Sequence, residues 1–295
     1  MTRRGRPPRE AEILPGSIRL GFFPIETRAA ATGPHPGYPP RRRSPLIAVA
    51  ALASLLVAAE PCAPPALRPG PVPWRAGEVL HYDLEVMGMV KAGTMSMEAG
   101  RPMFGGTQIP LKAHVKNTSV FAKIRRIVGT AMSWVDARTL LPERARDDVL
   151  EDGVKKVSDA RIQGDPAAVI IETDFGGQKA TARHERKGEV LDALSAAYYL
   201  RAADLKPGQE LCFDVVGLRR FWRFRGKVAA KPERVDSAGG IFDTLRVEGT
   251  IERADKPGTK RPLYVWISTD PRRVLVGAVS EIDLGPASAL LSRPP

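Results

Sequence analysis

The residues that could do chemistry are few and stand apart in the sequence. The 295-residue chain has four histidines, His35, His81, His114 and His184, and none of them has the HxH or HExxH spacing with which two imidazoles bind one zinc ion. His81 and His114 fall on the polar side of stretches that alternate apolar and polar residues, so we expect them to face solvent. We expect no metal site and no cofactor.

A catalytic serine or a carboxylate pair is not indicated either. The sequence contains no G-x-S-x-G nucleophile elbow, and Ser195 lies inside an expected helix without a neighbouring glycine. Asp147 and Asp148 are consecutive in an expected strand, where adjacent side chains point to opposite faces and cannot share a proton. We therefore expect that the protein is not an enzyme.

Two cysteines, Cys62 and Cys212, are the whole thiol inventory. In an oxidising compartment they can form a disulfide, which would join a proline-rich segment to the expected strand "ELCFDVV". The pairing requires that the flexible segment brings Cys62 close to Cys212, and two free thiols are the alternative.

Alternating residue patterns predict a mainly β fold. In "GEVLHYDLEVMG", Leu80, Tyr82 and Leu84 fall on one face and His81 and Asp83 on the other. The stretches "KAGTMSMEAG" and "IPLKAHVKN" continue the pattern. Further strands are expected near residues 130–136, 142–150, 153–162, 167–174, 179–186, 210–217, 219–229, 241–252, 262–268 and 273–284. Short strands separated by Gly, Pro and Asp predict a single antiparallel domain, either barrel-like or a strongly curved sheet.

One segment, "LDALSAAYYLRAADLKPG", has helical spacing instead. Apolar residues recur between Leu191 and Leu205, Asp192 is a candidate N-cap, and Lys206-Pro207-Gly208 is a stop signal. This single helix would either cover an open end of the barrel or one sheet face, or form a lid over a ligand cavity.

Two basic stretches bear on possible partners. "SVFAKIRRIVG" combines apolar residues at helical spacing with Lys123, Arg125 and Arg126, which is typical of a helix on anionic lipid, although a strand is the favoured interpretation. "LRRFWRFRGKV" alternates aromatic and arginine residues, and a strand with an aromatic core face explains it without nucleic acid. We expect no nucleic-acid partner and at most peripheral membrane contact.

The N-terminal part predicts export. In "RRRSPLIAVAALASLLVAAEPCAPP", three arginines precede an uncharged run from Leu46 to Ala59 that is too short to span a bilayer comfortably. We expect residues 44–59 to be the hydrophobic region of a signal peptide cleaved near Ala59, which gives a periplasmic or secreted protein. A retained N-terminal membrane anchor is the alternative. Residues 1–59 also hold nine arginines and three glutamates, a net +6 of the chain's +12.

The expected domain organisation follows from composition. Residues 1–43 are proline-rich and aperiodic, which predicts a disordered extension. Alternatively, the start is misassigned and translation begins near Arg41. Residues 60–73 are a proline-rich linker without a core. Residues 74–287 form the β-rich domain, and 288–295 are a C-terminal tail.

Several stretches together resemble a known family. "GEVLHYDLEVMGMVKAGTMSME", "FAKIRRIVGTAMSWVDARTLLPE", "DALSAAYYLR" with "LKPGQ", and "LYVWISTDPRRVLV" are similar, in order and spacing, to exported bacterial proteins of the domain-of-unknown-function 3108 family. The resemblance covers about residues 74–285. It implies a signal peptide and a mainly β fold, with no established activity and no catalytic residues to transfer.

Two classes of function remain open. In the first, the curved sheet binds a lipophilic or cell-envelope ligand, with Trp134, Tyr198 and Trp222 as candidate lining residues. In the second, the protein is a non-enzymatic structural or interaction protein of the cell envelope, and these aromatics are ordinary core. An apolar interior of several hundred Å³ would favour the first class, and a filled interior the second.

Overall fold

The computed structural model describes residues 62–295 except 89, 165–166, 218–219 and 255. The expected N-terminal extension, the signal-peptide region and the cleavage site near Ala59 lie outside the described residues. The chain from Pro61 to Pro295 forms a unit of its own, and all three hydrophobic core clusters fall within it. This part therefore has the core that it needs to fold independently.

Strands make up most of this unit, and one α-helix interrupts them. The helix is α1 (Ala193–Ala202), and two short 3₁₀ turns are η1 (Phe104–Gly106) and η2 (Phe121–Lys123). The strands are β1 (Glu78–Val86), β2 (Val90–Ala99), β3 (Gln108–Asn117), β4 (Ile127–Asp136), β5 (Pro142–Glu151), β6 (Val154–Gln163), β7 (Ala168–Phe175), β8 (Gln178–Glu185), β9 (Val190–Asp192), β10 (Glu210–Gly217), β11 (Arg220–Val228), β12 (Glu233–Ser237), β13 (Gly240–Arg253), β14 (Lys260–Ser268), β15 (Leu275–Ile282) and β16 (Gly285–Leu291).

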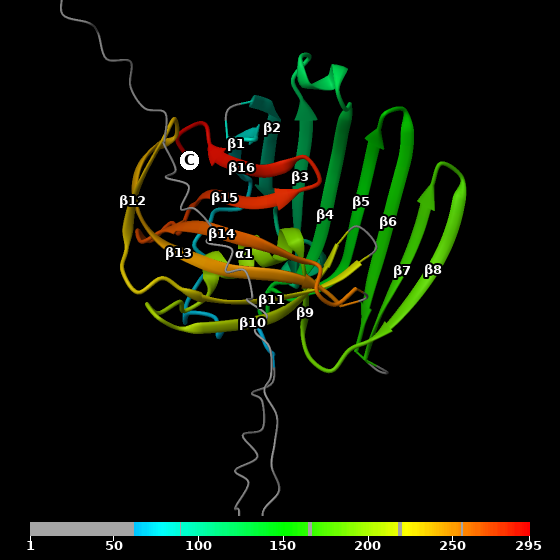
Figure 1. Ribbon diagram of the computed structural model, residues 1–295. Coiled ribbons are helices and arrows are strands. Elements are labelled where there is room, and N and C mark those ends of the chain that lie inside the picture. Colours follow the sequence, from blue (N-terminus) through cyan, green and yellow to red (C-terminus); the bar gives the residue numbers. More distant parts are fainter. Residues whose placement is uncertain (1–61, 89, 165–166, 218–219, 255) are drawn as a thin grey trace, which may run out of the picture. The chain divides into compact units, whose positions relative to one another are not determined.

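All strands belong to one curved sheet that does not close (Figure 1). Its order is β8-β7-β6-β5-β4-β3-β2-β1-β16-β15-β14-β13-β11-β10-β9, with β12 paired to β13. Neighbours are antiparallel except β9 and β10, which are parallel. The mainly β fold with a strongly curved sheet and one helix is confirmed.

The end of the chain differs from the expected boundary. The last strand, β16, runs from Gly285 to Leu291 and pairs with both β1 and β15. The strand therefore extends four residues into the stretch 288–295 that was expected to be a tail. Its small, apolar sequence "GPASALL" lacks the polar alternation that marks the other strands.

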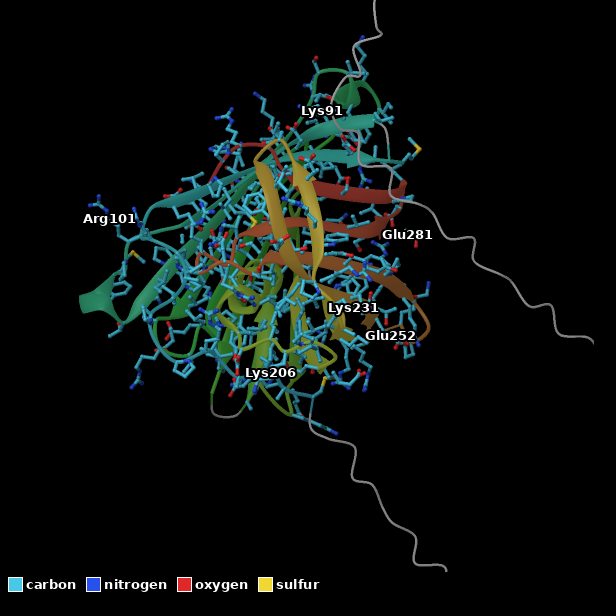
Figure 2. All side chains as sticks on the ribbon, turned by 90° about the vertical axis from the view of Figure 1, so that its left-hand side faces the viewer. Lys91, Arg101, Lys206, Lys231, Glu252 and Glu281 are labelled. Atoms are coloured by element: carbon cyan, nitrogen blue, oxygen red, sulfur yellow. A yellow bond between two sulfur atoms is a disulfide. The ribbon has the colours of Figure 1, made fainter. Side chains whose placement is uncertain are left out.

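We call the face of the sheet that contacts α1 the inner face. On β1 the residues Leu80 and Tyr82 point to it and are 1% exposed, whereas the alternating residues His81 and Asp83 point outward. Residues directly opposite each other in paired strands lie on the same face, so Met95 of β2 and Leu291 of β16, which lie opposite Tyr82, also point to the inner face. Charged side chains project from the periphery, including Lys91, Arg101, Lys206, Lys231, Glu252 and Glu281 (Figure 2).

Two strands approach each other closely at Gly226 and Gly249. These two glycines lie directly opposite each other on β11 and β13. A Cβ atom at Gly226 would lie 2.2 Å from the carbonyl oxygen of Glu248, and one at Gly249 would lie 2.3 Å from that of Arg225. Only glycine fits such a contact between backbones.

The helix is held inside the curve. The side chain of Asp192 accepts hydrogen bonds from the backbone N–H groups of Leu194 and Ser195, and the hydroxyl of Ser195 accepts one from the N–H of Asp192, which completes a capping box. Eight of the ten residues of α1 are buried, because the helix contacts β3 and β4 on one side and β9 and β10 on the other. The helix therefore fills this end of the inner face.

The expectation of a linker without a core is wrong for the segment from Cys62 to Leu67. Cys62 and Cys212 form a disulfide with a Cα–Cα distance of 4.8 Å, and Leu67 forms a β-bridge with Ala203 at the end of α1. The hydroxyl of Tyr199 donates to the carbonyl of Pro65 at 2.9 Å. Proline limits regular pairing, but these contacts pack the segment from Cys62 to Leu67 against the domain.

Candidate functional site

The three aromatic residues expected to line a ligand site do not meet in one place. Tyr198 lies on α1, is 1% exposed and contacts Trp74 edge-on at 5.0 Å between ring centroids. Trp134 alternates on β4 with the buried Ser133 and Val135, so it lies on the outer face. Because the outer face does not contact the interior, Trp134 was wrongly placed as a lining residue, and Tyr198 is a core residue.

Trp222 is the candidate that remains on the inner face. It lies on β11, is half-buried, and shares its face with the buried Phe224. The guanidinium of Arg261 stands over its ring at 5.8 Å, and the same group donates to the carboxylate of Asp283 at 2.7 Å. A cation and an aromatic ring are thus adjacent at the border of the inner face.

The half of the inner face away from α1 is apolar but only partly buried. Across three neighbouring strands, Leu84 of β1 lies opposite Ala289 of β16, which lies opposite Ala278 of β15. These and four similar inward residues form what we call the inner apolar patch: Leu84, Met95, Ala113, Ile251, Leu263, Ala278 and Ala289.

Small side chains cause the incomplete burial of this patch. Ala113, Ala278 and Ala289 fill little of the space inside the curve, whereas large side chains and α1 fill the other half. A partly exposed apolar surface on the concave side of a sheet is a suitable binding surface for an apolar ligand.

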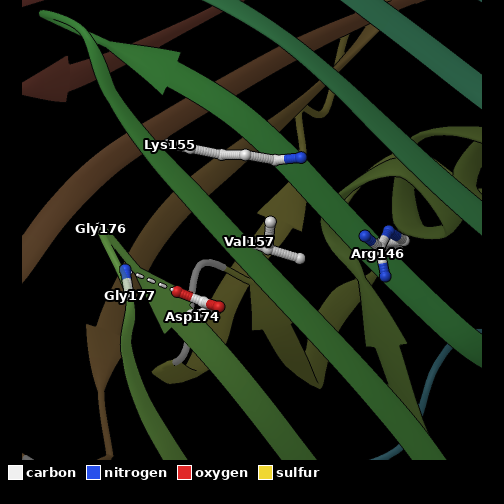
Figure 3. A pocket seen from close by; sticks show the side chains of 6 residues that line it. All are labelled: Arg146, Lys155, Val157, Asp174, Gly176 and Gly177. Carbon is white, nitrogen blue, oxygen red and sulfur yellow. Dashed lines mark hydrogen bonds between the residues drawn. The ribbon is translucent and has the colours of Figure 1, made fainter.

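A pocket on the other side of the sheet has the opposite character. It has a volume of about 480 Å³ and is lined by Arg146, Lys155, Val157, Asp174 and the β7–β8 turn, Gly176-Gly177 (Figure 3). By strand pairing these side chains lie on the outer face, where Val157 is opposite Asp174. It is therefore not the apolar interior cavity that would favour a carrier.

The charges of this outer pocket are already compensated. Arg146 donates to Asp159 at 3.1 Å and lies 3.5 Å from Asp148, and Asp174 accepts the N–H of Gly177 at 2.9 Å. Burial alone would raise the pKa of Asp159, but the hydrogen bonds and charges of Arg144 and Arg146 hold it below its usual range. Such a network stabilises the sheet and leaves little charge for a ligand.

Two largely buried polar pairs at α1, Arg201 with Glu78 and Asp192 with Ser133, were not found from the sequence. Arg201 is fully buried and its guanidinium donates to both carboxylate oxygens of Glu78, at 2.6 and 3.2 Å. Asp192 accepts a 2.5 Å hydrogen bond from the hydroxyl of Ser133, and burial raises its pKa. An arginine inside the apolar run "AAYYLRAA" was the one available signal, because a charge there requires a buried partner.

The histidines stay apart. His114 lies on the outer face with its Nδ1 3.3 Å from the Thr130 hydroxyl, and His184 packs against Phe221. Within the described part of the chain, no three His, Cys, Asp or Glu residues are grouped to hold a metal ion. Among residues 62–295 with described positions, none of the helices has the length and apolar character of a membrane span.

Comparison with known proteins identifies the family. Residues 81–292 match the model of the family described as "Protein of unknown function (DUF3108)", and the chain belongs to this family. No curated protein shows significant sequence similarity to it.

Two solved structures are similar at low identity. A beta-barrel-like protein of domain of unknown function DUF1849 from Brucella abortus is 10% identical, with 74% of this chain and 96% of that chain covered and a TM-score of 0.47. A protein with a YmcC-like fold from Bacteroides fragilis is 8% identical, with 79% and 99% covered and a TM-score of 0.28.

Proposed function

We propose that this protein is an exported cell-envelope protein that binds an apolar ligand, such as the acyl chain of a lipid, on the inner apolar patch. The observation that carries the proposal is the partial exposure of this patch on the concave side of the sheet. Water contact with a contiguous apolar surface is unfavourable, and an acyl chain would remove that contact. No catalytic step, metal or cofactor is part of the proposal.

Arg261 and Trp222 supply the polar part of this proposed site. The Arg261 side chain is 29% exposed and lies opposite Ile251 of the patch, so its guanidinium can reach a carboxylate or phosphate group at the end of an acyl chain. Asp283 accepts a hydrogen bond from this guanidinium at 2.7 Å, and an anionic head would take its place. The ligand class is therefore an amphiphile with an anionic head.

A fluorescent fatty acid tests the proposal on the protein of residues 61–295. Ala278→Phe fills the inner apolar patch and should weaken probe binding by about tenfold, which corresponds to roughly 1.4 kcal/mol. The matched control is Val279→Phe, because Val279 is the next residue on β15 and points to the outer face. Equal probe affinity for both variants, with native circular dichroism, would contradict binding at this patch.

The alternative function is a structural or interaction protein of the envelope. The filled half of the inner face around α1 and the polar character of the outer pocket support it. It predicts no binding of any lipid class by the unmodified protein.

We also propose that the protein acts outside the cytoplasm after cleavage near Ala59. The basic and apolar run of residues 41–59 supports this localisation, and the disulfide of Cys62 with Cys212 fits an oxidising compartment. Intact-mass measurement of protein from the envelope should give a chain beginning near Glu60. A mass that retains residues 41–59 would favour the membrane anchor.

A further inference from the structure

We propose that the tip of the β3–β6 region docks on an anionic membrane surface. This tip surface consists of the apolar residues Val120, Ile124, Val128 and Leu150 and the basic residues Lys116, Lys123 and Arg126. The proposal does not rest on ligand binding by the inner apolar patch, because none of these residues belongs to it.

The apolar residues of the tip are unusually exposed. Val120 and Ile124 flank η2 and are 68% and 69% exposed. Val128 and Leu150 lie opposite each other on the outer face of β4 and β5 and are 37% and 43% exposed. Figure 1 shows η2 projecting beyond the ends of β3 and β4.

The loop that carries Val120 and Ile124 is held in position. Phe121, between them, is 4% exposed and packs in a small core cluster with Val86 and Ala92. The hydroxyl of Thr118 accepts the N–H of Phe121 at 3.2 Å and donates to the carbonyl of Lys91 at 3.1 Å. Because the loop is already ordered, insertion of its aliphatic residues costs little conformational entropy.

The charge of the tip selects the partner. Residues 116–128 include four basic and no acidic residues. Arg125 pairs with Glu151, and the Asp152 carboxylate accepts the backbone N–H of Arg126 at 2.7 Å, but within the described residues no carboxylate forms an ion pair with the side chains of Lys116, Lys123 or Arg126. Exposed aliphatic residues beside uncompensated cations match an anionic lipid surface, in which the aliphatics enter the interface and the cations stay at the headgroups. In a symmetric dimer through the same tip, these cations would face each other and repel.

Vesicle cosedimentation tests the inference on the protein of residues 61–295, which lacks the N-terminal apolar run. The protein should bind vesicles of phosphatidylglycerol with phosphatidylcholine and should bind phosphatidylcholine alone much more weakly. V120S combined with I124S should lower the partition coefficient on anionic vesicles about tenfold, since two partly inserted aliphatic side chains are lost. K123Q combined with R126Q should lower it about 25-fold, at about fivefold per charge.

Matched controls sit elsewhere on the surface. Ile241 is 58% exposed at the β12–β13 hairpin, and Lys231 projects from the periphery, so I241S and K231Q should leave vesicle binding unchanged (Figure 2). In a second measurement, Ile124→Trp should show blue-shifted emission with anionic vesicles, and Ile241→Trp should not.

Three outcomes would overturn the proposal. They are absence of binding to anionic vesicles, equal binding by the tip and control variants, and a tip-dependent dimer in place of vesicle binding. Failure of membrane docking can be distinguished from failure of the proposed ligand binding, because V120S/I124S should bind the fluorescent fatty acid as the unmodified protein does.

Discussion

Replacing Glu78 by glutamine should lower the free energy of unfolding by about 3–5 kcal/mol. The change removes the carboxylate that pairs with Arg201, whose side chain is completely buried. Arginine keeps its charge at any pH at which the protein is folded, so the variant leaves a charged guanidinium without a counter-ion in the core.

The structure determines what is lost and what remains. Glu78 accepts two hydrogen bonds from Arg201, at 2.6 and 3.2 Å. The carbonyls of Arg273 and Arg272 stay in place at 2.8 and 3.2 Å, and the ring of Trp74 stays 5.2 Å from the guanidinium. These neutral groups cannot replace a negative charge, so the expected loss is a large part of the roughly 5–15 kcal/mol that stabilises a typical domain.

Urea unfolding at neutral pH, followed by circular dichroism, measures this loss. The matched control is Asp83→Asn, which removes the exposed partner of Lys91, and it should change the free energy of unfolding by no more than about 1 kcal/mol. Adding Arg201→Met to Glu78→Gln should recover part of the loss, because no buried charge then remains.

The result that refutes this reasoning is a loss for Glu78→Gln no larger than that of the control. It would mean that solvent or another group compensates Arg201, and that the C-terminal end of α1 is not fixed by this ion pair. A double variant no more stable than Glu78→Gln alone would contradict the same reasoning.

Three further predictions concern the interior. Cys212→Ser should lower the free energy of unfolding by about 2–5 kcal/mol, since the disulfide to Cys62 spans 150 residues, and native alkylation that labels two thiols in the unmodified protein would contradict the bond. Burial raises the pKa of Asp192 in the folded state, so the folded protein keeps a proton that the unfolded chain releases near the ordinary aspartate pKa of 3.8. The free energy of unfolding should therefore fall as pH rises from about 3.8 through the raised pKa, and Asp192→Asn should lack this decline. The same pH dependence in the variant and the unmodified protein would contradict the raised pKa. Tyr198→Phe should leave stability unchanged or raise it by about 1 kcal/mol, because the hydroxyl is buried without a partner among the described residues, and a clear loss in urea unfolding would show a missed hydrogen bond.

Local patterns predicted most of the sheet because many of its strands have one buried and one polar face. The alternation of Leu80 and Tyr82 with His81 and Asp83 places β1 and its faces correctly. Asp192 was also predicted as the N-cap of the helix, because a short acceptor side chain before an apolar run satisfies the free N–H groups. The helix ends at Ala202 and not at Leu205, since Ala203 pairs with Leu67 from the distant N-terminal segment.

Features that depend on distant partners could not be predicted. Short strands such as β9 and β12 have too few residues to show a period, and they form because a neighbouring strand offers hydrogen bonds. The pairing of Arg201 with Glu78 joins residues 123 positions apart, which no local pattern reveals. The outward position of Trp134 depends on the register of β4, which the sequence left open.

The basic stretch 118–128 shows the same limit. Neither the amphipathic helix nor a strand throughout was right, because Phe121 turns into a core cluster and the strand starts only at Ile127. Apolar residues at helical spacing can therefore belong to an anchored loop whose remaining aliphatic side chains point outward.

Native mass spectrometry of the protein released from the cell envelope without detergent tests the central claim most directly. We expect a species heavier than the polypeptide by the mass of an amphiphile, and we expect it to be lost in Ala278→Phe and retained in Val279→Phe, since only Ala278 points to the inner apolar patch. A bare polypeptide mass for the unmodified protein, together with no binding of fluorescent probes from several lipid classes, would contradict the claim that the inner face binds an apolar ligand.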